Sequence, residues 1–250
     1  MLDIGQGDAL FIQSPTGTQV MFDGGPVRKI LGPLSRVMPF YDKSIDAIVI
    51  TNPDADHIGG FLDILKNYKV GKVFEPGTLN DSKTYQNLEA EIKRQNISDV
   101  LLRRGMKLDL GGGAMIEILF PDRDVSTWAT NDGSVVAKLS YGKTLVMLTG
   151  DATTETEKII LTENSAAKLR STILKVGHHG SRTSTSASFA QAVAPMYALI
   201  SDGKDNKYGH PHQEVLDVLS QFGAKIFRTD LLSTIVMKSD GQNIKFSFTK

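Results

Sequence analysis

The placement of the histidines is the feature that most constrains how this chain can fold. All five histidines of the 250 residues stand in three clusters, which contain His57, the pair His178 and His179, and the pair His210 and His212. Each cluster follows an apolar run typical of a strand, and α/β proteins collect their ligands at the carboxyl ends of strands. Scattered structural histidines would not group in this way. We therefore expect an α/β fold with one ligand site at a sheet edge.

The runs between the clusters predict alternating strands and helices. Ala47 to Ile50 is continuously apolar, as in a strand that is buried on both faces. The pattern predicts helices over 27–38, 84–94 and 153–161 and from 215, and strands near 9–13, 19–22, 100–102, 114–120, 172–176 and 197–200, with a hairpin of 134–141 and 144–149 and two closing strands near 226 and over 234–237. No repeat or Pro/Ser-rich linker interrupts the chain, so we expect one domain over residues 1–250. Its abrupt start leaves open that a short N-terminal strand is missing.

The composition limits the classes of function. Cysteine is absent, which excludes disulfides, thiolate zinc sites and cysteine nucleophiles. The formal net charge is zero, so binding to a polyanion requires a local patch of charge. No stretch approaches the roughly 18 apolar residues of a membrane span, and the N-terminus does not resemble a signal peptide. A fragment of a membrane protein would lie outside the cytoplasm, whereas a free-standing chain would be cytoplasmic.

The run Asn52-Pro-Asp54-Ala-Asp56-His57 is the first candidate metal site. In a loop that leaves a strand, alternate residues point the same way, so Asn52, Asp54 and Asp56 can share a direction. The following Gly59-Gly60 lets the chain turn so that His57 joins them. Oxygen and imidazole ligands suit manganese, zinc, magnesium or iron. One aspartate could instead cap the next helix, but a cap does not explain two carboxylates and a histidine.

Asp151 is the second candidate. It follows the apolar strand Leu145 to Thr149 and a flexible Gly150, so it can reach over the sheet edge and bridge two metal ions. The alternative reading is an N-cap for the helix that begins near Thr153.

Several motifs together resemble the metallo-β-lactamase superfamily. The run at 52–57 is similar to its His-x-His-x-Asp-His signature with Asp in place of the second His. Asp-Ile-Gly-Gln-Gly-Asp at 3–8, Phe-Asp-Gly-Gly at 22–25, Gly-Asp at 150–151, Gly-His-His-Gly-Ser at 177–181 and Tyr-Gly-His-Pro at 208–211 follow in order. The ordered set, which spans nearly the whole chain, resembles the soluble domain of ComEC-type competence proteins, the DNA-uptake channel family.

The resemblance implies an αββα sandwich with one or two divalent ions at the sheet edge. Mn²⁺ and Zn²⁺ are the ions expected first. The implied metal ligands are Asn52, Asp54, Asp56, His57, Asp151 and His178. Asn52 stands where the family usually has His, and an amide oxygen is the weaker zinc ligand. The usual histidine between His57 and Asp151 is also missing, which leaves the first metal position with Asn52, Asp54 and the shared Asp151. His178 is taken as the inward member of its pair because it is nearer to the strand end.

The implied chemistry is hydrolysis of a DNA phosphodiester by metal-bound water. Asp56 would hold metal and orient the water. His210 would be a further metal ligand, a phosphate contact or the group that protonates the leaving oxygen. The residues expected to contact substrate are Asn131, Ser134, Lys175, His179 and Ser181. The basic side chains of Arg182, Lys204 and Lys207 lie beside the histidine clusters in sequence and can bind phosphate, although solvated surface charge explains each of them as well.

Two other functions remain open at this point. The same site can hydrolyse a lactone, thioester or other small ester, which a closed apolar pocket would favour. Alternatively, the loss of histidine at Asn52 leaves an inactive binding module. DNA is the expected partner, together with a membrane channel portion if the chain is a domain of a larger protein. A β-lactam substrate is not expected, because those enzymes usually show the fuller histidine set.

Overall fold

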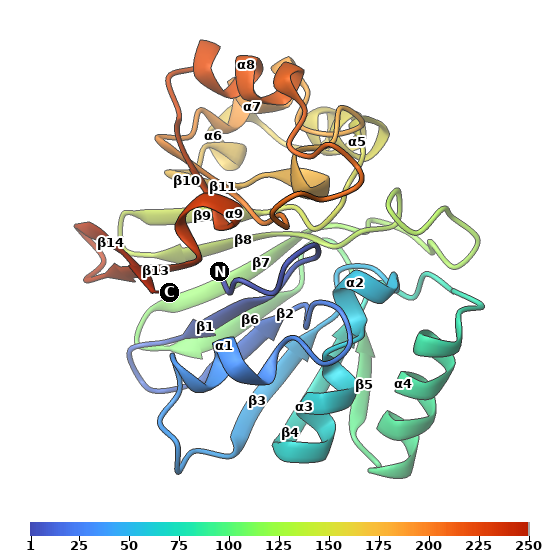
Figure 1. The fold of residues 1–250 in the computed structure, drawn as a ribbon. Helices are drawn as coiled ribbons and strands as arrows, with labels where there is room; N and C mark the ends of the chain where they lie inside the picture. Colours follow the sequence, from blue (N-terminus) through green and yellow to red (C-terminus); the bar gives the residue numbers. More distant parts are fainter. Residues whose placement is uncertain (250) are drawn as a thin grey trace.

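The computed structural model, described over residues 1–249, contains two β-sheets that pack face to face (Figure 1). The first sheet has the order β1-β2-β3-β4-β5. Its strands are β1 (Leu10–Gln13), β2 (Gln19–Phe22), β3 (Ser44–Val49), β4 (Lys69–Glu75) and β5 (Ser98–Leu101). The second has the order β12-β11-β10-β9-β8-β7-β6. Its strands are β6 (Lys107–Gly111), β7 (Ala114–Phe120), β8 (Val136–Tyr141), β9 (Thr144–Leu148), β10 (Ile173–Lys175), β11 (Tyr197–Ile200) and β12 (Lys225–Arg228), and a separate hairpin joins β13 (Thr234–Ser239) to β14 (Ile244–Thr249).

Helices cover the outer face of each sheet, which gives the expected αββα arrangement (Figure 1). The helices on the side of the first sheet are α1 (Leu31–Ser35), α2 (Ala55–Ile58), α3 (Phe61–Asn67) and α4 (Lys83–Arg94). Those on the second are α5 (Thr154–Glu163), α6 (Ala166–Leu169), α7 (Ala187–Val193) and α8 (Gln213–Gln221), and the short α9 (Thr229–Leu232) precedes β13. Among the helices of residues 1–249, none combines the length and the apolar character of a membrane span.

The side chains of each sheet alternate between two apolar layers. In β2, Phe22 packs between the sheets while its neighbour Met21 packs against the helices of the first sheet. In β9, Leu148 likewise faces the space between the sheets, and Met147 faces the helices of the second sheet. Because successive side chains of a strand point to opposite faces, strands covered on both sides must be apolar throughout. This confirms the reading of the run at 47–50 as a strand buried on both faces.

Most expected elements are present, and the exceptions have local reasons. The strands predicted over 114–120 and 197–200 are β7 and β11. The helix expected over 27–38 shrinks to α1, because Arg28 adopts a φ of 63° that a helix does not tolerate. The unpredicted β4 contains Gly71, whose missing side chain allows close approach to the Asp46 carbonyl of β3. Two further strands, β6 and β14, were not predicted, so the chain ends in one more strand than expected.

Three carboxylates meet where α4 crosses the β4–β5 edge. Glu75, Glu89 and Asp99 place one oxygen each within 4.8 Å of the others. Burial, together with the nearby charges of Asp99 and Glu89, raises the pKa of Glu75 to about 8. In the folded protein Glu75 therefore keeps its proton near neutral pH.

This pKa predicts a pH-dependent effect of Glu75→Gln on stability. A carboxyl with a raised folded-state pKa contributes stability at low pH and loses it as the pH rises from about 4.5, its ordinary value, to about 8. The glutamine side chain does not titrate, so the variant should not share this loss. Between pH 5 and pH 8 its free energy of unfolding should therefore rise, relative to that of the wild type, by on the order of 2 kcal/mol. Urea unfolding at the two pH values measures the difference. Glu214→Gln, at an exposed position, should show no such gain, and an equal gain there would contradict the assignment.

Candidate metal centre

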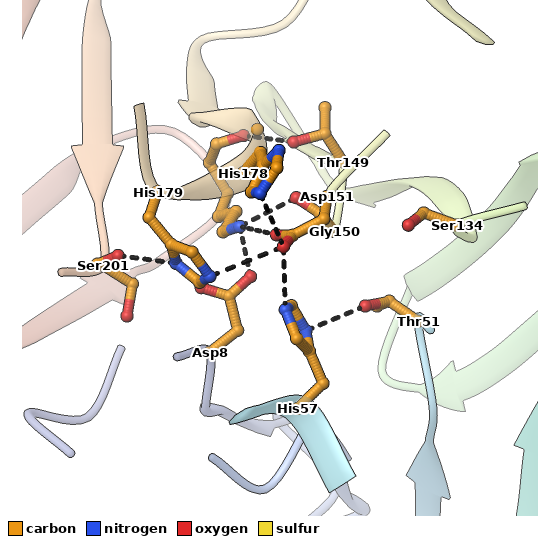
Figure 2. A network of polar contacts seen from close by, with 12 residues as sticks. Asp8, Thr51, His57, Ser134, Thr149, Gly150, Asp151, His178, His179 and Ser201 are labelled. Atoms are coloured by element: carbon orange, nitrogen blue, oxygen red, sulfur yellow. Dashed lines mark hydrogen bonds and ion pairs between the residues drawn. The ribbon is translucent and has the colours of Figure 1, made fainter. Parts of the chain in front are cut away.

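The site forms where the carboxyl ends of strands from both sheets come together. Asp8 lies before β1, Asp23 follows β2, and His57 lies in α2 after β3. Asp151 follows β9, and His179 lies in the tight turn after β10. Figure 2 shows His57, His179 and His178 arranged around Asp151, with Asp8 beside His179. Histidines and acidic residues that lie far apart in the sequence thus share one buried site.

Asp23 orients the His57 ring through its Nδ1 atom, the nitrogen that faces away from the centre of the site. The two are joined by an Nδ1 to Oδ2 distance of 2.9 Å, and Asp23 in turn accepts hydrogen bonds from the Thr51 backbone N–H at 2.8 Å and the Thr51 hydroxyl at 2.6 Å. A proton on Nδ1 satisfies the carboxylate and leaves Nε2 as a free lone pair. That Nε2 faces Asp151, 3.0 Å from its Oδ2.

His179 is oriented in the same way from the other sheet. Its Nδ1 lies 2.8 Å from the carbonyl oxygen of Ser201, to which it can donate. Its Nε2 lies 3.5 Å from Oδ2 of Asp56 and 3.5 Å from Oδ2 of Asp151. Fixing the outer nitrogen of a histidine by a carboxylate or carbonyl is the usual support of a metal-binding imidazole.

The expectation that His178 is the inward member of its pair is corrected by this geometry. His178 keeps 23% of its side chain exposed, its Nδ1 lies 3.0 Å from the Thr183 hydroxyl, and its Nε2 is 3.8 Å from Asp151. His179 is buried. Both residues adopt a positive φ, 48° and 54°, so the chain turns tightly here and closeness to the strand end does not decide which ring points inward.

The donor set fits a divalent cation. Asp56, His57 and His179 offer ligand atoms within 4.8 Å of one another, and Asp151 and Asp8 form a second such group with His179. Within residues 1–249, the buried Nε2 atom of His179 and Oδ1 of Asp151 have no hydrogen-bond partner, although a buried polar atom ordinarily has one. Burial alone would lower the pKa of His179, but Asp151 and Asp8 raise it to about 10. The pocket thus favours positive charge where the free ligand atoms converge.

Asn52 and Asp54 occupy a separate hydrogen-bonded cluster. Asp54 accepts hydrogen bonds from the Asn80 side chain at 3.1 Å and the Thr130 hydroxyl at 2.9 Å. The amide oxygen of Asn52 accepts the backbone N–H of Asp54 at 2.9 Å. Asp54 belongs to none of the metal-compatible groups found in residues 1–249. It also makes no side-chain capping bond to α2, and the residue before α5 is Thr153 rather than Asp151, so capping explains neither aspartate.

Lys175 lies inside the protein and does not reach the surface as a phosphate contact. It is 1% exposed, its ammonium forms an ion pair with Asp8, and it donates to the Gly150 carbonyl at 2.9 Å. The same ammonium is 3.9 Å from Oδ1 of Asp151. The expected phosphate contact is therefore corrected: Lys175 is an internal cation that faces two carboxylates of the site.

The other expected substrate contacts lie at different depths. Ser134 is buried and lies 3.4 Å from the Asn52 amide nitrogen. Asn131 is half-buried, and its amide oxygen has no hydrogen-bond partner among residues 1–249. Ser181 is buried, with its hydroxyl 3.0 Å from that of Thr183. Only Asn131 retains a free polar atom in this set.

His210 lies against the histidine pair. Its ring stacks on that of His179, with centroids 6.3 Å apart and planes 30° apart. Burial, together with the neighbouring His179 and His178, lowers the pKa of His210 to about 4. The ring is thus neutral near pH 7, which favours a hydrogen-bonding or ligand role over the role of proton donor.

Two residues of the site carried a signal in the sequence but no assigned role. Asp8 is the last residue of the run Asp-Ile-Gly-Gln-Gly-Asp, and Asp23 is the second residue of Phe-Asp-Gly-Gly. Gly7 has a φ of 127°, and a Cβ there would clash with the Asp56 carbonyl. The glycine therefore lets the segment that carries Asp8 approach α2. Aspartates beside glycines, as in these two runs, are therefore the sequence signal that points to both residues.

Comparison with known proteins gives a consistent result. Residues 2–201 match the Metallo-beta-lactamase superfamily. ComE operon protein 3 of Bacillus subtilis is 33% identical over 253 residues, which cover 94% of this chain and 32% of the relative. Recombination protein 2 of Haemophilus influenzae is 29% identical, over 91% of this chain and 27% of the relative. The chain thus spans about a third or less of the length of these curated relatives.

Solved structures share the fold at low sequence identity. The metallo-beta-lactamase fold protein YhfI from Bacillus subtilis superposes with a TM-score of 0.59 at 10% identity, over 98% of both chains. A metallo hydrolase from Ignicoccus hospitalis gives a TM-score of 0.56 at 14% identity, over 100% of this chain and 98% of the other.

Proposed function

This chain belongs to the metallo-β-lactamase superfamily, and from that premise we propose that it is a metal-dependent phosphodiesterase that cleaves DNA. The single observation that carries the hydrolase assignment is the convergence of the buried Nε2 atoms of His57 and His179 on Asp56 and Asp151. The choice of DNA is supported by relatives named for competence, among them Competence protein ComA of Neisseria gonorrhoeae, 28% identical over 92% of this chain and 30% of the relative.

We assign the metal to His57, His179, Asp56 and Asp151. A bound divalent cation supplies a water of lowered pKa and offsets the charge that develops on the phosphate. Asp23 and the Ser201 carbonyl keep the two imidazoles in place through their Nδ1 atoms. Asp56 has 38% of its side chain exposed, in contrast to 4% or less for the other three. Substrate would therefore enter on the Asp56 side, where that carboxylate can orient the attacking water.

The position of an apolar groove in the protein bears on the small-ester alternative. A groove of about 510 Å³ with mainly apolar walls opens between β1 and β13, and its lining includes Leu10, Phe11, Ile235 and Met237. None of the proposed metal ligands lines it. An ester bound in this groove would not reach the metal, so the groove does not favour that activity.

The proposal is tested with metal-stripped protein and fluorescent single- and double-stranded DNA, to which manganese, zinc or magnesium is returned. Cleavage should appear with at least one metal. His179→Gln should weaken metal binding by about 100-fold or more, since even the loss of an outer-shell partner costs 10- to 100-fold. His178→Gln should change it less than tenfold. Competition with a fluorescent chelator measures both affinities.

Three other results would contradict parts of this proposal. Metal binding without cleavage of any DNA would contradict the nuclease and favour a small ester. Failure to bind metal at micromolar concentration would indicate an inactive module. A larger loss in the His178 variant than in the His179 variant would reverse the assignment of the pair.

A further inference from the structure

A rigid loop beside the metal centre carries an exposed tyrosine. Between β11 and α8, the Asn206 side chain donates to the carbonyls of Gly203 at 3.0 Å and His210 at 2.7 Å. Its amide oxygen accepts the backbone N–H groups of Tyr208 at 3.2 Å and His210 at 3.0 Å. Four hydrogen bonds from one side chain therefore fix the backbone on both sides of Tyr208, which is 53% exposed.

The Tyr208 ring continues a stack that begins at the metal centre. It lies on the His210 ring with centroids 5.6 Å apart and planes 21° apart, and His210 lies on His179. One ring thus separates Tyr208 from the proposed ligand His179. An exposed aromatic ring held in this way offers a π-face close to the site.

Positive charge accompanies the ring. The Lys207 ammonium lies over the Tyr208 ring, 5.1 Å from its centre, at the end of an exposed side chain. Arg182 is exposed, and its backbone N–H donates to His212 at 3.2 Å, so it lies on the same side of the site. Although the whole chain is neutral, this part of the surface thus joins an aromatic ring to cations, the combination that binds single-stranded nucleic acid.

We propose that Tyr208 stacks on an unpaired nucleobase next to the phosphate held at the metal centre. The inference rests on the proposed function and makes it more specific: the substrate is a single strand or a frayed end. Every base presents a π-face, so stacking requires no particular sequence, but the bases of an intact duplex are covered by their neighbours. The Lys207 ammonium supplies a contact for the phosphate of the same nucleotide.

Binding by metal-free protein tests this independently of cleavage. The probes are fluorescein-labelled dT12, an abasic strand of equal length and a 12-base-pair duplex, with affinity measured by fluorescence anisotropy. Tyr208→Ala should weaken binding of dT12 about 5- to 100-fold, the effect of losing one stacked base. It should leave the abasic strand and the duplex within twofold. Tyr208→Phe should keep wild-type affinity for all three, because the ring and not the hydroxyl makes the contact.

The matched control is Tyr41→Ala. Tyr41 is 76% exposed but lies before β3, at the end of that strand opposite the site. It should leave all affinities unchanged. Equal affinity of wild type and Tyr208→Ala for dT12 would overturn the inference, as would an equal loss for dT12 and the abasic strand. Thermal unfolding of each variant shows whether it is folded, and the phenylalanine variant decides the question if the alanine variant is not.

Activity separates this inference from the proposed function. With metal returned, Tyr208→Ala should raise KM for single-stranded DNA, whereas the Tyr41→Ala control should hydrolyse both single-stranded DNA and bis(p-nitrophenyl) phosphate as the wild type does. No hydrolysis of either substrate by the wild type would contradict the phosphodiesterase, and the anisotropy result would still decide the role of Tyr208. Normal hydrolysis with no effect of Tyr208→Ala on KM or on dT12 affinity would contradict the stacking role alone.

Discussion

Replacing Asp151 with asparagine should abolish metal-dependent hydrolysis and reduce metal affinity by more than about 100-fold. Oδ2 of Asp151 lies 3.0 Å from Nε2 of His57 and 3.5 Å from Nε2 of His179, so the carboxylate stands between the two free imidazole nitrogens. Burial alone would raise the pKa of Asp151, but His57 and His179 hold it well below its ordinary value. Asparagine keeps the shape and removes the charge. Loss of an outer-shell partner alone costs 10- to 100-fold, so loss of a central ligand should cost more.

Isothermal titration with manganese and zinc measures the affinity, and circular dichroism shows whether the variant keeps its fold. Asp109→Asn provides a matched control, because Asp109 is exposed on β6 and asparagine keeps the side-chain oxygen that accepts the Gly111 backbone N–H at 2.8 Å. This control should bind metal with the affinity of the wild type. A folded Asp151→Asn protein with wild-type metal affinity would remove Asp151 from the ligand set.

Lys175→Met should destabilise the protein strongly even without metal. The Lys175 ammonium is buried between Asp8, Asp151 and the Gly150 carbonyl. Methionine fills a similar volume but leaves Asp8 as a buried carboxylate without its nearest cation. Breaking a buried ion pair in this way costs about 3–5 kcal/mol. We therefore expect the free energy of unfolding, from urea titration of metal-free protein, to fall by that amount.

A double-mutant cycle with Asp8→Leu distinguishes the ion pair from simple loss of packing. If the two charges stabilise each other, the double variant should lose clearly less stability than the sum of the single variants, because Asp8 no longer remains as a buried carboxylate without Lys175. Additive losses would show that Lys175 contributes through its aliphatic chain alone.

The sequence predicted the elements whose pattern is local. The run at 114–120 could be read as a strand because it is long, apolar and bounded by Gly113 and Pro121. The strand β14 also has a local pattern, because apolar residues alternate with polar ones at Ile244, Phe246 and Phe248. By contrast, β4 was hidden because Gly71 interrupts its pattern, and that glycine is explained only by the neighbouring strand.

The same division applies to the site. The grouping of histidines with Asp56 and Asp151 could be predicted, because residues at the carboxyl ends of strands share an edge. The inward direction of His179 could not, because it depends on two consecutive positive φ angles. Nor could the burial of Lys175, since a lysine at a strand end is ordinarily solvated, and only the approach of Asp8 from a distant segment gives it a partner.

The division of the proposed ligands between the two sheets has a mechanical consequence. Asp56 and His57 follow the end of β3 in the first sheet, whereas Asp151 and His179 follow β9 and β10 in the second. An ion held by all four would act as a cross-link between the halves of the sandwich, and its binding energy would oppose their separation. At a free ion concentration 100-fold above Kd, this adds about 2.7 kcal/mol to the free energy of unfolding. The free metal concentration would then control the stability of the sandwich as well as the reactivity of the site.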